Sequence, residues 1–335
     1  MRVVVTGASG YVGDRLCHAL VERGHSVRAL VRHTSDVSSL PPHSDNFELA
    51  YGDITNYRSL LDAFHGCDAV FHAAALTEPW LPDPTQFFAV NVEGLRNVVR
   101  AATATGTVKK LVCTLSASAL GPTDGYVADE EQVHPEKTYC SEYERSQVAA
   151  LKVAQQAASD GVPIVVVYLG IVYGPGKLTA SNVVAHLLVE LFGGGLLARA
   201  GFEKDIFSFS HIDDVVKGHI AAMDKGKAGE TYMLTGENAS FASLLDMAAA
   251  IAGTRKPSLK IPLWVFEILG WLLILVSRIT GRPPLVSPSV VHVLRCQWAY
   301  SCEKAKRDLG YSPRGLKDGL LDVLPWLRSR ELINY

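Results

Sequence analysis

The chain has 335 residues, of which 48% are hydrophobic and 20% charged, and its formal net charge is -2. This length suits one large domain or two closely packed domains with a sizeable core. The balanced charge and the lack of Lys/Arg runs argue against a nucleic-acid partner. The six cysteines show no CxxC spacing, so we expect reduced thiols, a cytoplasmic location and no metal site.

Short apolar runs alternate with amphipathic segments along the first half of the chain. MRVVVTG enters a strand directly, so we expect no signal or transit peptide. Helical spacing of apolar residues follows in 11–24 and 55–66. This alternation predicts an α/β fold with a Rossmann-type, doubly wound parallel sheet. The predicted strands are 2–7, 25–31, 47–53, 68–75, 110–116 and 163–169.

The pattern loosens after Gly174 and resumes in FSFSHIDDVVKGHIAAM (207–223), where we expect a further strand and helix. We predict two units on this basis. A dinucleotide-binding domain covers 1–172 plus about 203–235, and a smaller C-terminal substrate-binding lobe covers about 173–202 plus 236–335.

TGASGYVG (6–13) places Gly7, Gly10 and Gly13 at the end of the first strand and the start of the first helix. Glycines there permit a tight turn and let a pyrophosphate approach the backbone, while the helix N-terminus supplies N–H donors. The alternative is a tight turn without a ligand. The position at the start of a βαβ series favours dinucleotide binding.

Two polar residues follow the second and third predicted strands. Arg32 stands where an acid would bind the ribose of NAD, and a guanidinium can pair with the 2′-phosphate of NADP. The alternative is a solvated surface arginine. Asp53 is placed to accept from an adenine amino group, or to cap the next helix in competition with Thr55.

Several motifs together resemble the extended short-chain dehydrogenases/reductases. They are TGASGYVG, YGDIT (51–55), HAAAL (72–76), NVEGLRNVVRAA (91–102), YERSQ (143–147), YGPGK (173–177) and HIDDVV (211–216). More narrowly, the chain resembles the plant farnesol dehydrogenases, which are relatives of dihydroflavonol reductases. The narrower resemblance is carried by ALGPTDG (119–125), YERS (143–146), LTGENASF (234–241) and CQWAYSCEKAKRDLGY (296–311).

The resemblance implies a catalytic Ser/Thr, a Tyr and a Lys four residues after the Tyr. Ser116 and Tyr143 take the first two positions, and Gln147 stands in place of the lysine. It also implies a homodimer through the helices around 91–102 and 143–158, and it favours NAD where Arg32 favours NADP. The implied cofactor-binding residues are Gly7, Ser9, Gly10, Tyr11, Val12, Gly13, Arg32, Asp53, Ile54, Ala73, Ala74, Ala75, Tyr143, Gln147, Leu169, Gly170 and Val172.

The Gln147 substitution matters because residues i and i+4 share a helix face. A cation at this position favours tyrosinate and lowers the pKa of Tyr143. Gln147 can hydrogen-bond ribose hydroxyls but carries no charge. Lys152 lies nearly on the opposite helix face and Lys137 precedes the helix, so neither is an evident substitute.

Two further departures from the family lie nearby. Leu115 replaces the first hydroxyl of an expected serine pair, and Leu169 replaces a proline usually found beside the nicotinamide amide. Together with Gln147 they indicate a remodelled pocket, with neutral decay or an engineered substitution as the alternatives.

Other polar residues carry weaker signals. We expect His211 to be structural rather than catalytic. We interpret Glu130, Glu131 and Glu142 as solvated charges at a loop and a helix start.

The apolar segment 261–280 has three interpretations. Its uninterrupted stretch, 268–276, is too short to span a bilayer, and Glu267 and Pro262 break the longer run. We expect a buried lid helix, with peripheral contact at an intracellular membrane as the alternative.

The motifs predict an NAD(P)-dependent alcohol dehydrogenase or carbonyl reductase for a small hydrophobic substrate, and the resemblance suggests a prenyl or terpenoid chain. Ser116 then binds the substrate oxygen, Tyr143 transfers the proton and Gln147 holds the ribose. One alternative is a non-redox isomerase or cyclase that retains a bound dinucleotide, because such chemistry needs no tyrosinate. The other is a catalytically silent dinucleotide-binding module.

Overall fold

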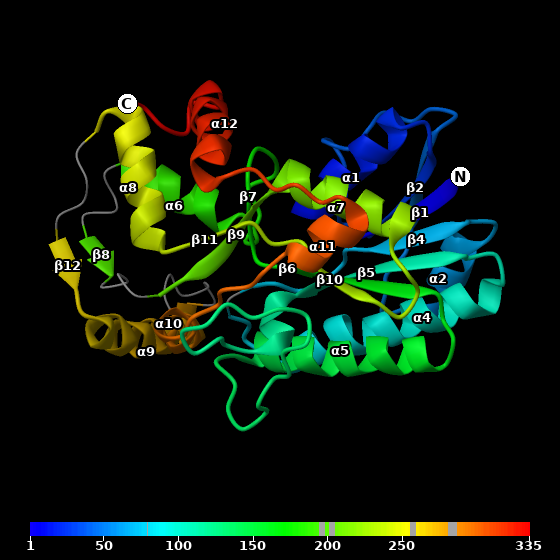
Figure 1. The fold of residues 1–335 in the computed structure, drawn as a ribbon, viewed down its shortest axis with the longest axis horizontal. Helices are drawn as coiled ribbons and strands as arrows, with labels where there is room; N and C mark the ends of the chain where they lie inside the picture. Colours follow the sequence, from blue (N-terminus) through cyan, green and yellow to red (C-terminus); the bar gives the residue numbers. More distant parts are fainter. Residues whose placement is uncertain (79, 194–197, 201–204, 255–258, 281–286) are drawn as a thin grey trace.

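The computed structural model describes residues 1–335 apart from 79, 194–197, 201–204, 255–258 and 281–286. Parts of the predicted boundary between the two units, including 201–204, fall outside the described residues. In the described part the chain forms a large parallel sheet covered by helices and a smaller lobe beside it (Figure 1).

The central sheet has seven parallel strands in the order β10-β6-β5-β4-β1-β2-β3, as the alternating pattern predicts. Each predicted strand is present within three residues of its expected ends. The strands are β1 (Arg2–Thr6), β2 (Ser26–Val31), β3 (Phe47–Tyr51), β4 (Ala69–His72), β5 (Lys110–Ser116), β6 (Ile164–Leu169) and β10 (Thr231–Met233).

Helices cover both faces of this sheet, which explains why its strands are mostly apolar on both sides. Alternate residues of β1 divide between the faces: Val4 packs in one buried cluster, and Val3 and Val5 in the other. One face carries α1 (Tyr11–Glu22), α7 (Ile212–Lys225) and α11 (Glu303–Leu309), and the other α2 (Tyr57–Phe64), α4 (Gly94–Thr105) and α5 (Glu142–Ser159).

Between β4 and α4 the chain passes through α3 (Thr85–Phe87) and the π-helix η1 (Phe88–Glu93). A 3₁₀ turn, η2 (Ala117–Leu120), follows β5. π-helical turns are rare in proteins, and those that occur are often found near functional sites. η1 packs against α5, the helix that carries Tyr143.

The smaller lobe is built on a three-stranded sheet in the order β11-β9-β7 and a two-stranded pair. Its strands are β7 (Ile171–Tyr173), β8 (Ala198–Ala200), β9 (Phe207–His211), β11 (Glu237–Ala239) and β12 (Leu259–Ile261). Its helices are α6 (Val183–Phe192), α8 (Phe241–Ala252), α9 (Leu263–Thr280), α10 (Pro288–Arg295) and α12 (Leu316–Ser329). The strand and helix expected from 207–223 are therefore present as β9 and α7.

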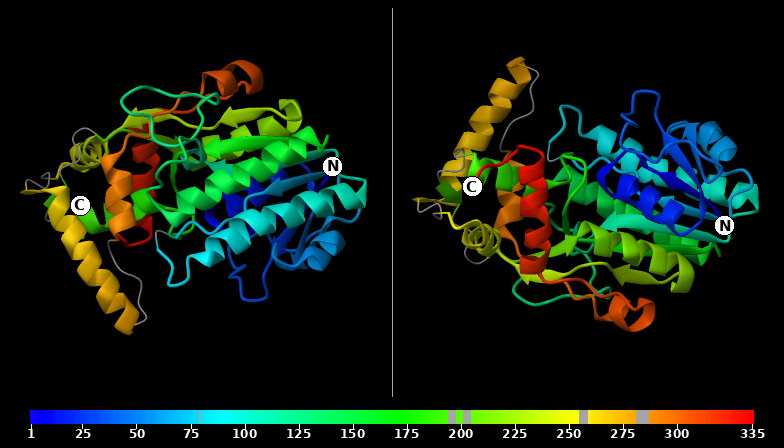
Figure 2. Two further views of the ribbon diagram at one scale, coloured as in Figure 1. Left: turned by 90° about the horizontal axis from the view of Figure 1, so that it is seen from below. Right: turned by 90° about the horizontal axis from the view of Figure 1, so that it is seen from above.

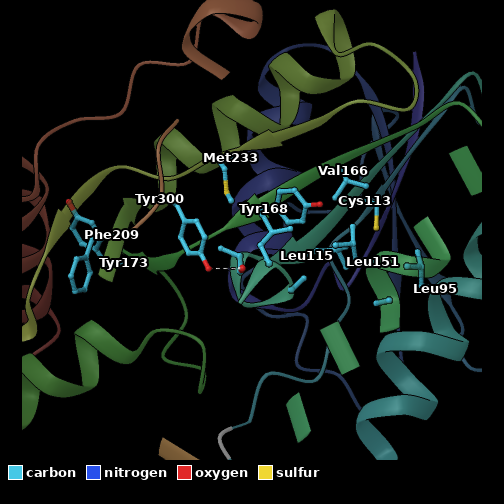
Figure 3. Close-up of a cluster of buried hydrophobic side chains, with 14 of the residues drawn as sticks. Leu95, Cys113, Leu115, Leu151, Val166, Tyr168, Tyr173, Phe209, Met233 and Tyr300 are labelled. Carbon is cyan, nitrogen blue, oxygen red and sulfur yellow. Dashed lines mark hydrogen bonds between the residues drawn. The ribbon is translucent and has the colours of Figure 1, made fainter. Parts of the chain in front are cut away.

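The apolar core continues from the central sheet into the lobe, where Tyr168, Tyr173 and Phe209 belong to one buried cluster (Figure 3). The Tyr300 hydroxyl donates across this junction to the carbonyl oxygens of Ala117 (3.0 Å) and Gly121 (2.5 Å). The chain after β5 is thereby held against the segment that follows α10.

The expectation that α9 is a buried lid is wrong. Its apolar side chains are largely exposed, including Trp264 (60%) and Trp271 (62%), and the helix projects from the lobe (Figure 2). It packs on one side against α10, where a carbon added to Gly270 would meet Pro288. Among the described helices, none combines the length and apolar character that a bilayer crossing requires.

Two other local expectations are corrected. Asn56, rather than Asp53 or Thr55, caps α2, because its side chain accepts from the N–H groups of Arg58 and Ser59. Glu130 is not a solvated charge: its Oε1 accepts from Met233 N at 2.6 Å, and burial raises the pKa of this carboxyl group.

Candidate functional site

The glycine-rich turn leaves space for a ligand at the start of α1. Gly7 has a φ of +71°, and a Cβ there would lie 2.7 Å from the Ala73 carbonyl oxygen. A Cβ on Gly13 would collide with the Gly7 backbone, so this glycine permits close packing of turn and helix. Gly10 precedes α1 and supplies no side-chain cap. The helix N–H groups therefore suit an anionic pyrophosphate, and the turn fits the predicted dinucleotide.

Two adjoining cavities, of about 490 and 220 Å³, run from this turn along the carboxyl ends of the strands. They share Ser9, Gly10 and Arg32 in their walls. Every predicted cofactor-binding residue except Gly13 lines one or both. The remaining lining residues from that set are Gly7, Tyr11, Val12, Asp53, Ile54, Ala73, Ala74, Ala75, Tyr143, Gln147, Leu169, Gly170 and Val172.

At the adenosine end of this cleft, Arg32 is exposed and follows the last residue of β2. Its backbone N–H is held by the Ser35 hydroxyl at 3.1 Å. Asp53 lies in the same cavity, where its Oδ1 accepts from Thr55 N at 2.8 Å and from the Thr55 hydroxyl at 2.7 Å. Asp53 thus shapes the turn that borders the cavity.

Tyr11 lines the cleft, but its hydroxyl is already engaged. It donates to the Gly174 carbonyl oxygen at 2.8 Å, which joins α1 to the smaller lobe. Burial raises the pKa of Tyr11, so the hydroxyl stays protonated. The contribution of Tyr11 to a ligand site is therefore the face of its ring.

Ser116 and Tyr143 meet at the other end of the cleft. Ser116 ends β5, and Tyr143 lies in the first turn of α5, which begins after the Ser141 cap. The two side chains line the same cavities, and the Ser116 Oγ accepts from the Ser118 hydroxyl at 2.9 Å. The structure brings together the two residues that sequence separates by a strand-to-helix connection.

Gln147 is buried, with 2% of its surface exposed, and its Oε1 accepts from Ser116 N at 2.9 Å. Because a backbone N–H only donates, the bonded atom is the amide oxygen. The NH₂ group is then the part of Gln147 available to a ligand. Gln147 therefore links α5 to the end of β5 by a hydrogen bond. This structural role was not predicted from the sequence.

The surroundings of Tyr143 keep its hydroxyl protonated. Burial raises the pKa of Tyr143 to about 12, the hydrogen bond with Ser116 opposes this shift, and the Glu78 carboxylate adds to it. Among the described residues that line these cavities, Arg32 is the basic residue, and it lies toward the adenosine end. Lys152 is exposed and pairs with Glu136 at 2.7 Å.

A third cavity, of about 180 Å³, also borders Ser116 and Tyr143. Its walls are mostly apolar and come from both units of the chain. Ser116 and Tyr143 line this cavity as well as the cleft. Other lining residues are Ala117, Leu169, Ile171, Phe207, Val293, Trp298 and Tyr300.

The two leucines that depart from the family pattern border these cavities. Leu115 lines the cleft, and Leu169 lies between the cleft and the apolar cavity, paired in register with Ser116. Both are nearly buried. Leu115 puts an apolar side chain in place of an expected hydroxyl, and Leu169 puts a longer apolar side chain in place of an expected proline, both in the cavity that Tyr143 lines.

Sequence reasoning missed a polar network behind the site. Asn91, in η1, accepts from Leu76 N at 2.8 Å and donates to the Ser146 hydroxyl at 3.0 Å, fixing α5 against the segment after β4. Buried Glu144 accepts from His134 Nε2 at 2.9 Å. His134 Nδ1 accepts from a backbone N–H, so Nε2 carries the proton. Asn91 within NVEGLRNVVRAA was the available signal for the first of these contacts.

His211 is structural, as expected. Its side chain caps α7 by accepting from Asp213 N, and its ring lies edge-on against Tyr173 at 5.5 Å. Among the described residues, no three or more His, Cys, Asp or Glu side chains are grouped to hold a metal ion.

Residues 3–235 match the family described as "NAD dependent epimerase/dehydratase family". A putative dihydroflavonol 4-reductase from Synechocystis sp. is 30% identical over 97% of this chain and 94% of its own length. Sterol demethylase protein B from Methylococcus capsulatus is 29% identical over 99% and 100%. A 4-hydroxy-2-methyl-3-oxo-4-farnesyl-3,4-dihydroquinoline-1-oxide ketoreductase from Stigmatella aurantiaca is 29% identical over 97% and 96%.

The solved structure of gox2253 is 32% identical and superposes with a TM-score of 0.83 over 99% of both chains. The fold, the glycine-rich turn and the paired Ser116 and Tyr143 agree with these similarities. The chain therefore belongs to the NAD dependent epimerase/dehydratase family, within the extended short-chain dehydrogenases/reductases, and has oxidoreductases among its relatives.

Proposed function

We propose that this protein is an NAD(P)-dependent oxidoreductase that interconverts a hydrophobic, prenyl- or terpenoid-like alcohol and its aldehyde or ketone. The observation that carries the proposal is the position of Ser116 and Tyr143, which line both the dinucleotide cleft and the apolar cavity. The farnesyl-bearing substrate named for one relative supports a long apolar chain, as does the resemblance to farnesol dehydrogenases.

The protonation state of Tyr143 suggests a direction. Its pKa of about 12 makes it a proton donor at neutral pH, which suits reduction of a carbonyl group. Ser116 then binds the substrate oxygen, and Tyr143 delivers the proton as negative charge develops there. The bound nicotinamide supplies the hydride. Gln147 orients Ser116 through the backbone and offers its NH₂ group to the ribose.

Arg32 supports NADP over NAD as the preferred cofactor. It is exposed at the end of β2, beside the adenosine end of the cleft, where an acid would contact an unmodified ribose. We expect Arg32→Ala to weaken NADP binding by about tenfold or more and to leave NAD binding nearly unchanged. Equal effects on both cofactors, measured by calorimetry, would show that Arg32 does not read the phosphate.

The second candidate is a non-redox isomerase or cyclase that retains its dinucleotide. The environment of Tyr143 favours it, because burial and the Glu78 carboxylate both stabilise the neutral phenol, and Arg32, the basic residue among the described lining residues, is not among the groups that shift its pKa. A neutral phenol beside Ser116 can polarise a substrate carbonyl without hydride transfer.

The deciding experiment follows nicotinamide absorbance with prenyl and terpenoid alcohols and aldehydes, for the wild type, Gln147→Lys and the uncharged control Gln147→Met. A lysine lowers the pKa of Tyr143, so alcohol oxidation at pH 7 should increase roughly tenfold for each pKa unit lowered, and its pH profile should move to lower pH. Turnover by the wild type establishes the oxidoreductase.

Turnover in Gln147→Lys alone would favour the non-redox candidate. Cofactor binding without turnover in any variant would leave a silent dinucleotide-binding module.

We also propose a homodimer through α4 and α5, as the family resemblance implies. Light scattering tests it: a charge reversal at an exposed position of α5, Lys152→Glu, should shift the mass to that of a monomer, whereas an unchanged mass would place the interface elsewhere.

A further inference from the structure

Two cysteines lie side by side at the edge of the candidate site. The sulfur atoms of Cys140 and Cys296 are 3.8 Å apart, although the residues are separated by 156 positions in sequence. Both side chains are half-buried, so a small oxidant has access to them. The remaining cysteines, Cys17, Cys67, Cys113 and Cys302, are buried.

Backbone hydrogen bonds hold both cysteines in place. Cys140 N donates to the Glu144 carboxylate, which is itself bonded to His134. Cys296 follows α10, and its N–H donates to the Val293 carbonyl oxygen at 3.2 Å. The two sulfur atoms therefore face each other from well-anchored segments.

The two thiols have unequal roles within the pair. The contact between the two sulfur atoms raises the pKa of Cys140 and lowers the pKa of Cys296, and the Glu144 carboxylate beside Cys140 also favours the protonated thiol there. Thiolates are the nucleophilic form of cysteine, so Cys296 is the one that reacts first with an electrophile. Burial raises the pKa of Cys113 to about 12, which keeps that thiol unreactive.

We propose that Cys140 and Cys296 form an oxidation site, in which a hydroperoxide converts the two thiols into a reversible disulfide. The Cys296 thiolate attacks the peroxide, breaking the O–O bond to give a sulfenic acid and releasing water or an alcohol after protonation. The Cys140 sulfur then attacks the sulfenic sulfur, forming the S–S bond and releasing water. Two thiols lose two electrons and two protons, and the peroxide is reduced by two electrons.

The geometry requires a modest movement. A disulfide has an S–S distance of about 2.0 Å, so the sulfur atoms must approach by about 1.8 Å. Side-chain rotation about two Cα–Cβ bonds can supply most of this approach.

The disulfide would join two walls of the apolar cavity. Cys140 adjoins Ser141, at the start of the helix that carries Tyr143, and Cys296 lies between Val293 and Trp298. The cavity is lined by Ser141, Tyr143, Val293 and Trp298. An effect on substrate binding rests on the proposed function, whereas formation of the disulfide does not.

The test treats the full-length protein with a small excess of hydrogen peroxide. We expect a mass loss of two hydrogen atoms, a Cys140–Cys296 cross-linked peptide in a non-reducing digest, and reversal by dithiothreitol. The melting temperature should rise by a few degrees on oxidation, because the cross-link closes a long loop. Cys302→Ser, at a buried cysteine, should behave like the wild type.

The single variants show which thiol reacts. Cys140→Ser should accumulate sulfenic and then sulfinic acid on Cys296, and Cys296→Ser should react much more slowly. The proposal fails if wild-type Cys296 is over-oxidised as fast as in Cys140→Ser, or if no cross-linked peptide forms. These readouts need no turnover, so their failure is distinct from failure of the proposed oxidoreductase activity.

Discussion

Gln147 shows how one side chain can exchange a catalytic property for a structural one. A lysine at this position has no acceptor atom, whereas the glutamine amide accepts from Ser116 N at 2.9 Å. The strand that carries Ser116 is therefore bonded to the helix that carries Tyr143. The substitution removes positive charge from the neighbourhood of the tyrosine and adds a hydrogen bond between its helix and the strand that ends at Ser116.

Loss of this hydrogen bond should be measurable as stability. Gln147→Leu leaves the Ser116 N–H without its partner, so we expect the free energy of unfolding to fall by about 1–3 kcal/mol. Gln155→Leu, at an exposed position of the same helix, should change it by less than about 0.5 kcal/mol. If urea denaturation gave the same change in unfolding free energy for both variants, the hydrogen bond from Ser116 N to Gln147 would contribute little to stability.

Two buried histidines predict a stability loss in acid. Burial lowers the pKa of His72 and of His219 to about 4, from 6.5 in the unfolded chain. Between pH 4 and pH 6.5 the unfolded state binds more protons than the folded state. Each buried neutral histidine therefore contributes roughly 3 kcal/mol to the free energy of unfolding above pH 6.5, and this contribution is lost as the pH falls to about 4.

Urea unfolding at pH 7 and pH 4.5 measures this loss. His72→Gln should remove about half of the difference in unfolding free energy between the two pH values that His72 and His219 cause together. His43→Gln, at an exposed site, should leave this difference unchanged. A pH dependence that is the same in His72→Gln as in the wild type would contradict the assignment.

At the level of elements, α9 differs most from its expected role. Trp264, Ile268, Trp271, Leu272 and Leu275 recur at helical spacing and are all more than half exposed. Glu267 turns away from them, toward Arg295 of α10 at 2.5 Å. We propose that this face lies on a bilayer surface. Its mixture of tryptophan and aliphatic side chains suits the membrane interface, and α10 beneath it lines the apolar cavity through Val293.

Vesicle flotation tests the α9 proposal. The double variant Trp264→Ser, Trp271→Ser should bind phosphatidylcholine vesicles at least about tenfold more weakly than the wild type, because two large apolar side chains lose their burial. Leu321→Ser, at an exposed apolar position of α12, is the matched control. Absence of wild-type flotation would overturn the proposal, and a concentration-dependent mass increase governed by the same tryptophans would assign the face to protein contact.

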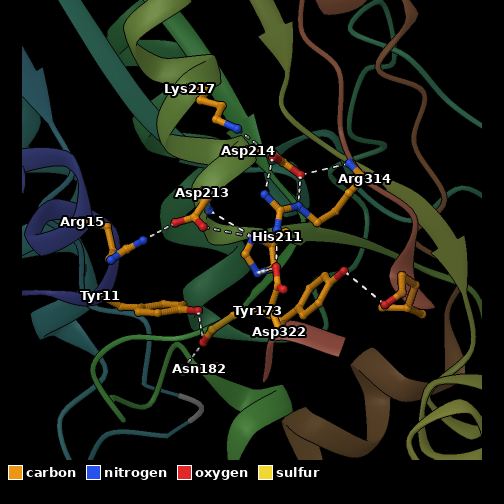
Figure 4. Close-up of polar contacts among 12 residues, drawn as sticks. Tyr11, Arg15, Tyr173, Asn182, His211, Asp213, Asp214, Lys217, Arg314 and Asp322 are labelled. Atoms are coloured by element: carbon orange, nitrogen blue, oxygen red, sulfur yellow. Dashed lines mark hydrogen bonds and ion pairs between the residues drawn. The ribbon is translucent and has the colours of Figure 1, made fainter. Parts of the chain in front are cut away.

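At the level of the whole molecule, the two units are joined by a polar network that spans α1, α7 and the segment before α12 (Figure 4). Arg15 pairs with Asp213, and Arg314 contacts Asp214 through Nε at 2.9 Å and Nη2 at 3.1 Å. The Asp214 side chain is 5% exposed. The network keeps the lobe in position over the dinucleotide cleft.

Removal of Arg314 should therefore destabilise the molecule. Arg314→Met leaves the Asp214 carboxylate buried without its main partner, and we expect a loss of about 3–5 kcal/mol in the free energy of unfolding. Lys217→Ala removes an exposed cation 3.8 Å from the same carboxylate and should cost less than about 1 kcal/mol. Similar losses for both variants in chemical denaturation would show that the contact is not energetically distinct.

Sequence alone determined the features that depend on local periodicity and on neighbours in the chain. The apolar runs predicted the central strands because a sheet covered on both faces has no polar side, and the glycine spacing predicted the turn before α1. The positions of Ser116 and Tyr143 followed from motif resemblance, and the structure places both at one site.

Tertiary structure alone decided what depends on distant partners. The bond from Gln147 to Ser116, the burial of Glu130 against Met233 and the pairing of Cys140 with Cys296 join segments that share no local pattern. The exposure of α9 was equally hidden, because an apolar helix has the same sequence whether protein, lipid or water lies beside it. Which surfaces meet is set by the packing of the whole chain.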